Sequence, residues 1–310
     1  MKKSLIKISD LKKEEVEKIL KRAFYYKKQD DLGVRKEDIL RGKNAVLVFE
    51  KPSLRTKVSF ESAINYLGGN TVFLSGEQIF AIGNETQGRE SIYDITKNLE
   101  RFCDIILARV FSNESITQID NFSTKPVINL LCNQHHPTQA LADIMVIKWH
   151  KKTLDNLKIS FIGDANNVAR SLLEICVLLE INFSIASPSG YSFSEKEQKL
   201  MQEKVKNKKV KIEFSNDPQS TVKNADIVYT DTFLSMGEEG MKDKLKKFKG
   251  FQVNLDLLKQ AKKEALFMHC LPAHRGLEVT DEVIDSKQSI VFDQAECRMH
   301  VAKALISLLI

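Results

Sequence analysis

Short apolar runs alternate along this chain with segments in which apolar residues recur at helical spacing. In the first half the expected strands are 45–49, 71–74, 103–109 and 127–131, and the expected helices are 10–24 (with Asp10 as N-cap), 53–67, 90–102 and 138–150. The second half continues with expected strands at 158–163, 182–187, 210–214, 226–230, 265–270 and 289–293, separated by helices, and a closing helix from about 296. Strands that alternate with helices pair in parallel, with helices on both faces of the sheet. The pattern therefore predicts an α/β protein with doubly wound parallel sheets.

The length of 310 residues favours two domains. The basic stretch His150-Lys151-Lys152 stands before the second series of strands, so we expect one domain over 1–149 and another over 150–295. Ligands of doubly wound sheets bind beyond the carboxyl ends of the strands. We therefore expect the active site in the cleft between the two domains, built from residues that directly follow strands.

Charge and cysteine usage exclude several classes of function. The net charge of +6 is compatible with an anionic substrate, but the lysine runs at 204–211 and 242–249 lack the interleaved aromatic residues of a nucleic-acid surface. The five cysteines form no CxxC pair, which argues against a zinc ribbon or a disulfide scaffold. Since the chain has no bilayer-length apolar run and no signal-peptide pattern, we expect a cytoplasmic protein without membrane contact.

The first candidate site follows the expected strand that ends at Phe49. Ser53, Leu54, Arg55 and Thr56 open a helix there. A helix N-terminus offers unpaired N–H groups and the positive end of the dipole, and Arg55 adds a fork that matches phosphate oxygens. Ordinary N-capping by Ser53 is the competing interpretation. Neither GxGxxG nor a Walker loop is present, so a phosphate site without a nucleotide is expected.

A second candidate site comprises the segment 135–139 and Arg109, which also follow strands. His136 or Gln139 at such a position can donate a hydrogen bond to a carbonyl oxygen. Capping by Thr138 behind a proline explains the same residues equally well, and Arg109 either caps the sheet edge or enters the cleft.

Three segments of the second half form a third candidate site. They are Asp164 with Asn166-Asn167, Asp231 with 235–237, and 269–272. Asparagine and aspartate side chains can hold an amino-acid head group. Cys270 is either an inert buried thiol or a reactive one. Zinc bound by His269, Cys270 and His274 is not expected, because adjacent residues of a strand point to opposite sides.

Taken together, these segments resemble the transcarbamoylase family. Residues 49–61 (FEKPSLRTKVSFE) are similar to its carbamoyl-phosphate signature, and residues 136–143 (HPTQALAD) to its second signature. The segments 163–167, 231–238 and 269–276 (HCLPAHRG) resemble the ornithine carbamoyltransferase branch, and residues 292–300 resemble its C-terminal helix. That helix, at about 296–310, is expected to pack back on the first domain. The resemblance runs in order along nearly the whole chain.

The resemblance assigns roles residue by residue. It implies that carbamoyl phosphate is bound by Ser53, Leu54, Arg55, Thr56, Gln87, Arg109, His136, Gln139 and Arg298. It implies that ornithine is bound by Asn167, Asp231, Ser235, Met236, Cys270 and Leu271. Cys270, Asp231, Arg55 and His136 are the expected catalytic residues, and neither a metal nor a cofactor is expected. The implied reaction is attack of the δ-amine of L-ornithine on the carbamoyl carbon, which gives L-citrulline and phosphate.

Two positions depart from the family pattern. Leu54 stands where the family usually has threonine, so one hydroxyl is missing and weaker phosphate binding is expected. The loop 75–89 is longer than usual; in this family it reaches a neighbouring subunit's site and supplies a glutamine, for which Gln87 is favoured over Gln78. The resemblance also implies a homotrimer, or a multiple of trimers, with shared active sites.

Two alternatives stay open. A transcarbamoylase for another acceptor (putrescine, an acylated ornithine or aspartate) would share the phosphate site. A paralogue that binds ligands without turnover would share the fold, although the intact Arg55, His136, Asp231 and Cys270 argue against it. The direction of the reaction, anabolic or catabolic, is not decided by the sequence.

Overall fold

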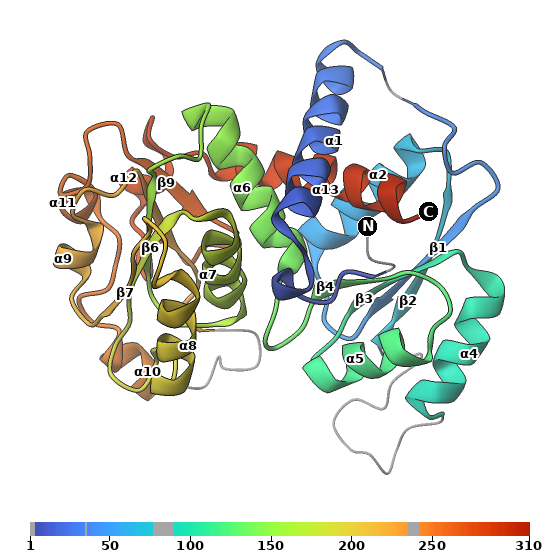
Figure 1. Cartoon of the computed structure of the whole chain (residues 1–310), viewed down its shortest axis with the longest axis horizontal. Helices are drawn as coiled ribbons and strands as arrows, with labels where there is room; N and C mark the ends of the chain where they lie inside the picture. Colours follow the sequence, from blue (N-terminus) through green and yellow to red (C-terminus); the bar gives the residue numbers. More distant parts are fainter. Residues whose placement is uncertain (1–3, 35, 77–89, 235–241) are drawn as a thin grey trace. The chain divides into compact units, whose positions relative to one another are not determined.

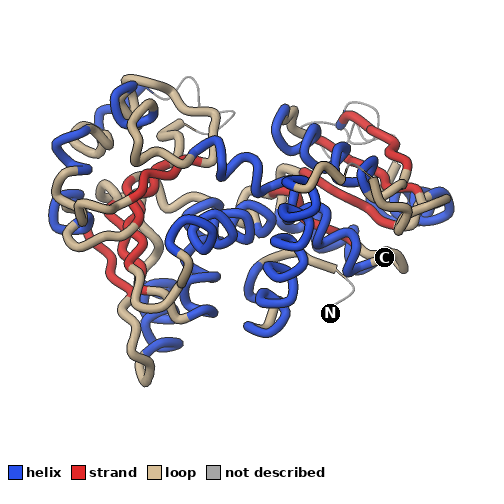
Figure 2. Tube along the Cα trace, turned by 90° about the horizontal axis from the view of Figure 1, so that it is seen from above, coloured by secondary structure: helices blue, strands red, loops and turns tan. Residues whose placement is uncertain are grey.

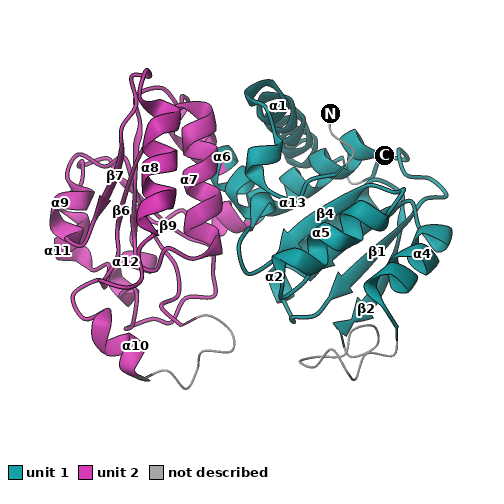
Figure 3. Cartoon of the chain, turned by 60° about the horizontal axis from the view of Figure 1, so that its bottom comes forward, with its two compact units in different colours: residues 1–145, 296–310 teal, residues 146–295 magenta. Residues whose placement is uncertain are grey.

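The computed structural model describes residues 4–34, 36–76, 90–234 and 242–310. The chain divides into two compact units, the first comprising 1–145 with 296–310 and the second 146–295 (Figure 1, Figure 3). Each unit contains one sheet, and each pairing between neighbouring strands is parallel. The prediction of two parallel-sheet α/β domains is confirmed. None of the helices in the described ranges has the length and apolarity needed to cross a bilayer.

The first unit is built around a four-stranded sheet. Its strands are β1 (Asn44–Phe49), β2 (Asn70–Ser75), β3 (Ile105–Arg109) and β4 (Val127–Leu131). Its helices are the short η1 (Ile8–Asp10), α1 (Lys13–Asp31), α2 (Leu54–Tyr66), α4 (Ile92–Phe102), α5 (Asn113–Phe122), most of α6 (Pro137–Lys151) and most of α13 (Val291–Leu309).

Helices cover both faces of this sheet (Figure 3). On one face, Val46 and Val48 of β1 and Ile106 of β3 pack with Ile116 of α5 in a buried apolar cluster that α4 also covers. The alternate residues of the same strands, such as Leu47 and Leu107, are equally buried. Burial of consecutive strand residues is what a parallel sheet covered on both faces requires.

The second unit is built around a five-stranded sheet. Its strands are β5 (Lys158–Ile162), β6 (Asn182–Ala186), β7 (Ile212–Ser215), β8 (Ile227–Thr230) and β9 (Leu266–His269). Its helices are α7 (Asn167–Leu179), α8 (Glu195–Val205), α9 (Pro218–Val222), α10 (Lys242–Lys247), α11 (Leu255–Leu258) and α12 (Asp281–Ile284). Figure 2 shows each group of strands with helices on both sides.

The strand order places a switch point in each sheet. The first sheet has the order β2-β1-β3-β4 and the second β7-β6-β5-β8-β9. The chain therefore leaves β1 toward one edge and returns to β3 on the other side of β1, and it does the same around β5 with β8. A crevice opens at such a point between loops that diverge from neighbouring strands, and ligands of doubly wound sheets bind there. Both switch points carry polar residues of the predicted sites.

Several sequence-based expectations were wrong in detail. Asp10 is not the N-cap of the first long helix; that position is Lys12, whose N–H donates to Glu15 at 2.8 Å. The strand expected at 289–293 is absent from this described segment, because α13 already begins at Val291 and Ser289 makes only an isolated bridge to Phe267. The helix α5 was not predicted. Finally, α6 runs through Lys151, so the expected basic turn lies within and just after a helix.

Candidate functional site

The N-terminus of α2 lies at the switch point of the first sheet. Ser53 is the N-cap, and its hydroxyl oxygen accepts from the Thr56 N–H at 3.4 Å. The Ser53 hydroxyl in turn donates to Thr56 Oγ1 at 3.0 Å. The N-capping by Ser53 that was the competing interpretation of this segment is therefore present, and the helix presents the positive end of its dipole at the carboxyl edge of the sheet.

Arg298 ties α13 to this helix N-terminus. Its guanidinium is buried and donates to Thr56 Oγ1 at 2.6 Å and to Gln139 Oε1. Because Thr56 Oγ1 accepts from both Ser53 and Arg298, the hydroxyl hydrogen of Thr56 is left to donate to a ligand. Gln139 is held from the other side, since its Nε2 donates to the buried Asp143 at 2.8 Å. Four residues predicted for the phosphate site thus form one connected group.

His136 is buried beside two arginines. Burial and then the charges of Arg298 and Arg109 hold the pKa of His136 well below its usual value, so its imidazole is neutral at pH 7. Thr138 Oγ1 lies 3.5 Å from His136 Nδ1. Arg109 ends the inner strand β3 and is 5% exposed, and its charge acts on the nearby His136. A neutral imidazole between cationic groups is suited to donating a hydrogen bond to a carbonyl oxygen.

Glu50 closes the rim of this switch point, and the sequence interpretation gave it no role. Its backbone N–H donates to the Arg109 carbonyl at 2.9 Å, and its carboxylate accepts from the Phe111 N–H. Burial raises the pKa of Glu50. Glu50 therefore fixes the loop after β1 against the loop after β3. The signal that could have revealed it is its place directly after an apolar strand.

The second sheet carries a carboxylate at its own switch point. Asp231 follows β8 and is 6% exposed. Its Oδ1 accepts from the Cys270 thiol at 3.1 Å, and its Oδ2 accepts from Asn166 Nδ2 at 2.8 Å. Asn166 is also the N-cap of α7, because its Oδ1 accepts from the N–H groups of Val168 and Ala169. Asp231 and Cys270, predicted from separate motifs, are in direct contact.

The loop after β9 is shaped by a buried pair, His269 and Glu278, both fully inaccessible. Nδ1 of His269 accepts from the Leu271 N–H at 2.9 Å, so its hydrogen is on Nε2, which lies 3.2 Å from Glu278 Oε1. The same Glu278 oxygen accepts from the His274 N–H at 2.5 Å. Glu278 thereby holds both ends of the segment that presents Cys270 and Leu271. Its role was not predicted.

One argument made from the sequence about this segment was wrong. Strand alternation was expected to keep His269 and Cys270 apart, but the strand ends at His269 and Leu271 takes a left-handed conformation with φ of 58°. One potential ligand atom each of Asp231, His269 and Cys270 consequently lies within 4.8 Å of the others. Nevertheless the group does not fit a metal ion as arranged, because Nδ1 of His269 accepts a backbone N–H and Nε2 faces Glu278.

Asp164, the other acid predicted for this half, forms a buried ion pair instead. Its Oδ2 lies 2.7 Å from Nζ of Lys244, whose side chain is 4% exposed. Lys244 Nζ also lies 5.3 Å from the centre of the Tyr191 ring. Asp164 therefore anchors α10, and its contact is with the protein rather than in an open site.

The remaining predicted residues either lie in the first turns of α2 and α7 or fall outside the described residues. Asn167 is the first residue of α7 and Arg55 the second of α2, and both are half-buried. The side chain of Leu54 is 75% exposed, so only its backbone belongs to the helix N-terminus. The expected ligands Gln87, Ser235 and Met236, together with the alternative Gln78, lie outside the described residues.

The two groups of residues have complementary chemistry. The first unit offers a helix N-terminus, a hydroxyl donor, three arginines and a neutral histidine, which together suit a phosphorylated anion with a carbonyl group. The second offers a carboxylate held by a thiol and an amide, which suits a primary amine. Each group lies at the switch point of its own sheet.

Comparisons with known proteins divide the chain near residue 150, with the C-terminal helix in the second family domain rather than with the first. Residues 3–149 match the family model of the carbamoyl-P binding domain of aspartate/ornithine carbamoyltransferase, and residues 155–309 match its Asp/Orn binding domain. An ornithine carbamoyltransferase of Methanococcus vannielii is 42% identical over 308 residues, which cover 97% of each chain. The anabolic ornithine carbamoyltransferase of Pyrococcus furiosus is 41% identical, with coverage of 99% of this chain and 96% of the relative.

Solved structures give the same result. The ornithine carbamoyltransferase from Pyrococcus furiosus superposes with a TM-score of 0.92 over 99% of this chain and 96% of that one. The anabolic ornithine carbamoyltransferase from Campylobacter jejuni, 35% identical, gives a TM-score of 0.91 over 100% and 99%. Since family models, sequence relatives and structures agree over nearly the full length, the chain belongs to the aspartate/ornithine carbamoyltransferase family.

Proposed function

We propose that the chain transfers the carbamoyl group of carbamoyl phosphate to the δ-amine of L-ornithine, giving L-citrulline and phosphate. The observation that carries this proposal is the Asp231 carboxylate, which accepts from the Cys270 thiol and the Asn166 amide at the switch point of the second sheet. A carboxylate in this position suits an amine nucleophile. The names of the similar proteins support the same acceptor.

Residues 1–149, with the helix from about 296 to 310, are assigned to carbamoyl phosphate. Arg55, Arg109 and Arg298 and the N-terminus of α2 would neutralise the phosphate as it leaves. The Thr56 hydroxyl and the neutral imidazole of His136 would donate to the carbamoyl oxygen as it gains negative charge. Gln139 would act through Arg298, since its amide oxygen accepts from that guanidinium.

Residues 150–295 are assigned to ornithine. The δ-amine has a reference pKa of about 10.4, so it must lose a proton before it attacks. Asp231 would hold the ammonium group, with Cys270 and Leu271 beside the reacting end and Asn167 at the amino-acid head group. The amine nitrogen then forms a bond to the carbamoyl carbon, and the bond from that carbon to the phosphate oxygen breaks. This chemistry depends on positioning and charge stabilisation.

We further propose that the chain assembles as a trimer through α2 and β2. The strand β2 is at the edge of its sheet, with Val72 47% and Phe73 37% exposed. On α2, Leu54 is 75% and Val58 51% exposed. Exposed apolar side chains on an edge strand and on the helix before it are typical of a surface that another protein covers. A second copy would cover this surface in the trimer that the family resemblance implies. Active sites shared between subunits, the role of Gln87, an active site in the cleft between domains and a cytoplasmic location stay predictions.

Citrulline formation by the purified protein tests the proposed activity. Carbamoyl phosphate would be supplied with ornithine and, in parallel, with putrescine, aspartate or N-acetylornithine. We expect turnover with ornithine alone, and a loss of about a hundredfold or more in Asp231→Asn. Asn166→Ala, which removes a partner of Asp231 but not its charge, should lose less. Turnover with another amine instead of ornithine would show that this amine is the acceptor. Ligand binding without product would indicate a non-catalytic paralogue.

The direction proposed is toward citrulline. The relatives from Pyrococcus furiosus and Campylobacter jejuni are both described as anabolic. Comparison of initial rates with ornithine plus carbamoyl phosphate against citrulline plus phosphate tests this proposal.

A further inference from the structure

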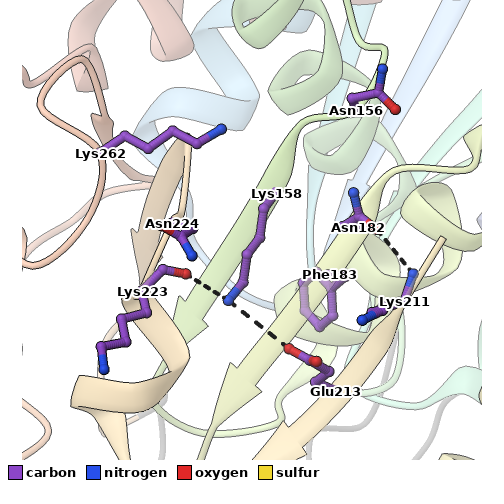
Figure 4. Close-up of a pocket in the computed structure, with 9 residues that line it drawn as sticks. All are labelled: Asn156, Lys158, Asn182, Phe183, Lys211, Glu213, Lys223, Asn224 and Lys262. Atoms are coloured by element: carbon purple, nitrogen blue, oxygen red, sulfur yellow. Dashed lines mark hydrogen bonds and ion pairs between the residues drawn. The ribbon is translucent and has the colours of Figure 1, made fainter.

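A basic pocket lies at the amino-terminal edge of the second sheet, at the opposite end of the strands from Asp231. It has a volume of about 340 Å³. Its lining residues stand at or just before the starts of strands β5 to β8, or in nearby loops: Asn156, Lys158, Asn182, Phe183, Lys211, Glu213, Lys223, Asn224 and Lys262 (Figure 4). Strands of four or five residues separate the two edges by roughly 15 Å, so this pocket is distinct from the half-site for ornithine.

The lining carries an excess of positive charge. Four of its nine residues are lysines and one is a glutamate. Lys262 is compensated by Asp226, whose two carboxylate oxygens each lie 2.8 Å from its Nζ. Glu213 lies 3.9 Å from Nζ of Lys158, beyond hydrogen-bond distance. Among the described residues, no carboxylate lies within ion-pair distance of Lys211 or Lys223, although Asp217 is near enough for the Lys223 charge to contribute to lowering the pKa of that aspartate. The lining of the pocket therefore keeps an excess of positive charge that nearby carboxylates balance only in part.

Lys158 is the central residue of the pocket, between Lys223 and Glu213 in Figure 4. Its side chain is only 19% exposed, and its Nζ donates to the Lys223 carbonyl at 2.9 Å. Burial lowers the pKa of Lys158, and the Glu213 carboxylate only partly offsets this effect. An anion in the pocket would supply the missing compensation.

The rim is held in place before any ligand binds. Asn182 Oδ1 accepts from the Lys211 N–H at 3.0 Å, and its Nδ2 donates to the Leu157 carbonyl at 3.1 Å. The bond from Lys158 to the Lys223 carbonyl fixes the third side. A site fixed in this way loses little conformational entropy on binding.

We propose that this pocket binds a phosphate group, as the dianion of free phosphate or of a phosphomonoester. An anion with two negative charges matches this excess of positive charge, and the ammonium groups with the side-chain amides of Asn156 and Asn224 suit its several oxygens. The buried ring of Phe183 forms an apolar floor. The volume leaves room for an organic group attached to the phosphate.

Equilibrium dialysis of the full chain against radiolabelled inorganic phosphate tests this proposal. We expect the double variant Lys158→Gln/Lys211→Gln to bind one phosphate fewer per chain than the wild type, with affinity at the pocket at least about tenfold weaker. Glu213→Gln should bind phosphate roughly two- to fivefold more tightly, because it removes a half-exposed like charge. Lys199→Gln, an exposed lysine on α8 outside the pocket, is the matched control and should bind as the wild type does.

The test compares variants with the wild type. Phosphate bound at the half-site for carbamoyl phosphate is the same in each protein and therefore does not affect the difference. If the double variant does not fold, Lys211→Gln alone replaces it, because this variant keeps the hydrogen bond from Lys158 to the Lys223 carbonyl. It should also bind phosphate more weakly than the wild type does. Equal phosphate numbers in wild type and pocket variants, an equal loss in Lys199→Gln, or equal displacement by acetate at the same ionic strength would overturn the proposal. Displacement by glycerol phosphate at lower concentration than by free phosphate would identify a phosphomonoester as the ligand, and the reverse order would identify free phosphate.

Discussion

At the scale of single residues, the strongest prediction about stability concerns Glu278. Its carboxylate accepts from the His274 N–H and faces Nε2 of His269, and it is fully buried. Glu278→Ala would leave the buried Nε2–H of His269 and the part-buried N–H of His274 without their acceptor, at roughly 1–3 kcal/mol for the first and less for the second. We expect the free energy of unfolding to fall by about 2–5 kcal/mol in urea titrations, and citrulline turnover to fall because the Cys270 loop is released. Glu278→Gln keeps an oxygen acceptor and should lose less.

Glu282→Ala is the matched control for this prediction. Glu282 is an exposed residue of the neighbouring helix α12, and its removal should change stability by no more than about 0.5 kcal/mol. If both alanine variants unfolded at the same urea concentration as the wild type, Glu278 would have no structural role.

The buried His136 is expected to make the free energy of unfolding depend on pH. In the folded chain its pKa is held well below the usual value, chiefly by burial, whereas in the unfolded chain it titrates near 6.5. Below pH 6.5 the unfolded state therefore takes up a proton that the folded state does not. This contribution to stability is fully present above about pH 6.5 and decreases by up to about 1.4 kcal/mol per pH unit below it.

Urea unfolding at pH 7.5 and 5.5 checks this dependence. His136→Gln should lose less stability between the two values than the wild type. Burial also lowers the pKa of His300, so adding His300→Gln should flatten the profile further. A wild-type profile that His136→Gln leaves unchanged would contradict the assignment of a neutral, buried imidazole.

Residues could be predicted from the sequence where the reason for their place is local. Ser53 caps a helix directly after a strand, and Asp231 follows a strand, and both patterns are visible along the chain. Glu278 could not be found in this way, because its contact with His269 depends on the left-handed turn at Leu271. The argument from strand alternation at Cys270 failed because β9 already ends at His269.

At the scale of elements, the contact between α1 and α13 leads to a prediction about stability. Lys303 of α13 is 1% exposed, and its Nζ lies 2.7 and 2.8 Å from the two carboxylate oxygens of Asp30 on α1. The same Nζ lies 3.6 Å from the centre of the Tyr66 ring, and burial and nearby carboxylates raise the pKa of Tyr66 to about 12. This pair therefore helps to hold the helix that also carries Arg298, the residue proposed to bind phosphate.

Asp30→Ala would leave a buried ammonium without its counter-ion, so we expect a loss of about 3–5 kcal/mol in the free energy of unfolding. The KM for carbamoyl phosphate should also rise as Arg298 shifts. Asp256→Ala is the matched control, because Asp256 pairs with Lys259 at the surface, where the two side chains are 90% and 70% exposed. This variant should lower the free energy of unfolding by less than about 1 kcal/mol. Equal costs for the two variants would show that the α1–α13 pair contributes no more than a surface ion pair.

Helices and strands could be predicted where their hydrophobic pattern fits only one type of secondary structure. The central strands β1, β3 and β5 are continuous apolar runs bounded by polar residues, and their positions were correct within two residues. The short apolar run 289–293 has the same composition but begins α13, since a run of this length fits either a strand or a buried helix. Only its continuation to Leu309 distinguishes the two.

At the scale of the whole molecule, the chain crosses between its two units within helices. The division falls inside α6 after Met145 and inside α13 before Glu296. The first unit is therefore completed by the last residues of the chain, which supply both Arg298 and Lys303. Sequence-based reasoning placed the closing helix with the first domain through the family resemblance, whereas the contacts with Thr56 and Asp30 give the physical reason.

The proposed trimer is the prediction that involves the molecule as a whole. Val58→Asp/Phe73→Asp would place two carboxylates on the apolar surface of α2 and β2, where desolvation on association is costly. We expect the mass in light scattering to fall from a trimer to a monomer and citrulline turnover to fall with it, since the family resemblance implies shared active sites. Leu200→Asp, on α8 of the second unit and 52% exposed in the wild type, should keep both mass and turnover. A double variant that stays trimeric would exclude this surface as the interface, and a fully active monomer would exclude shared sites.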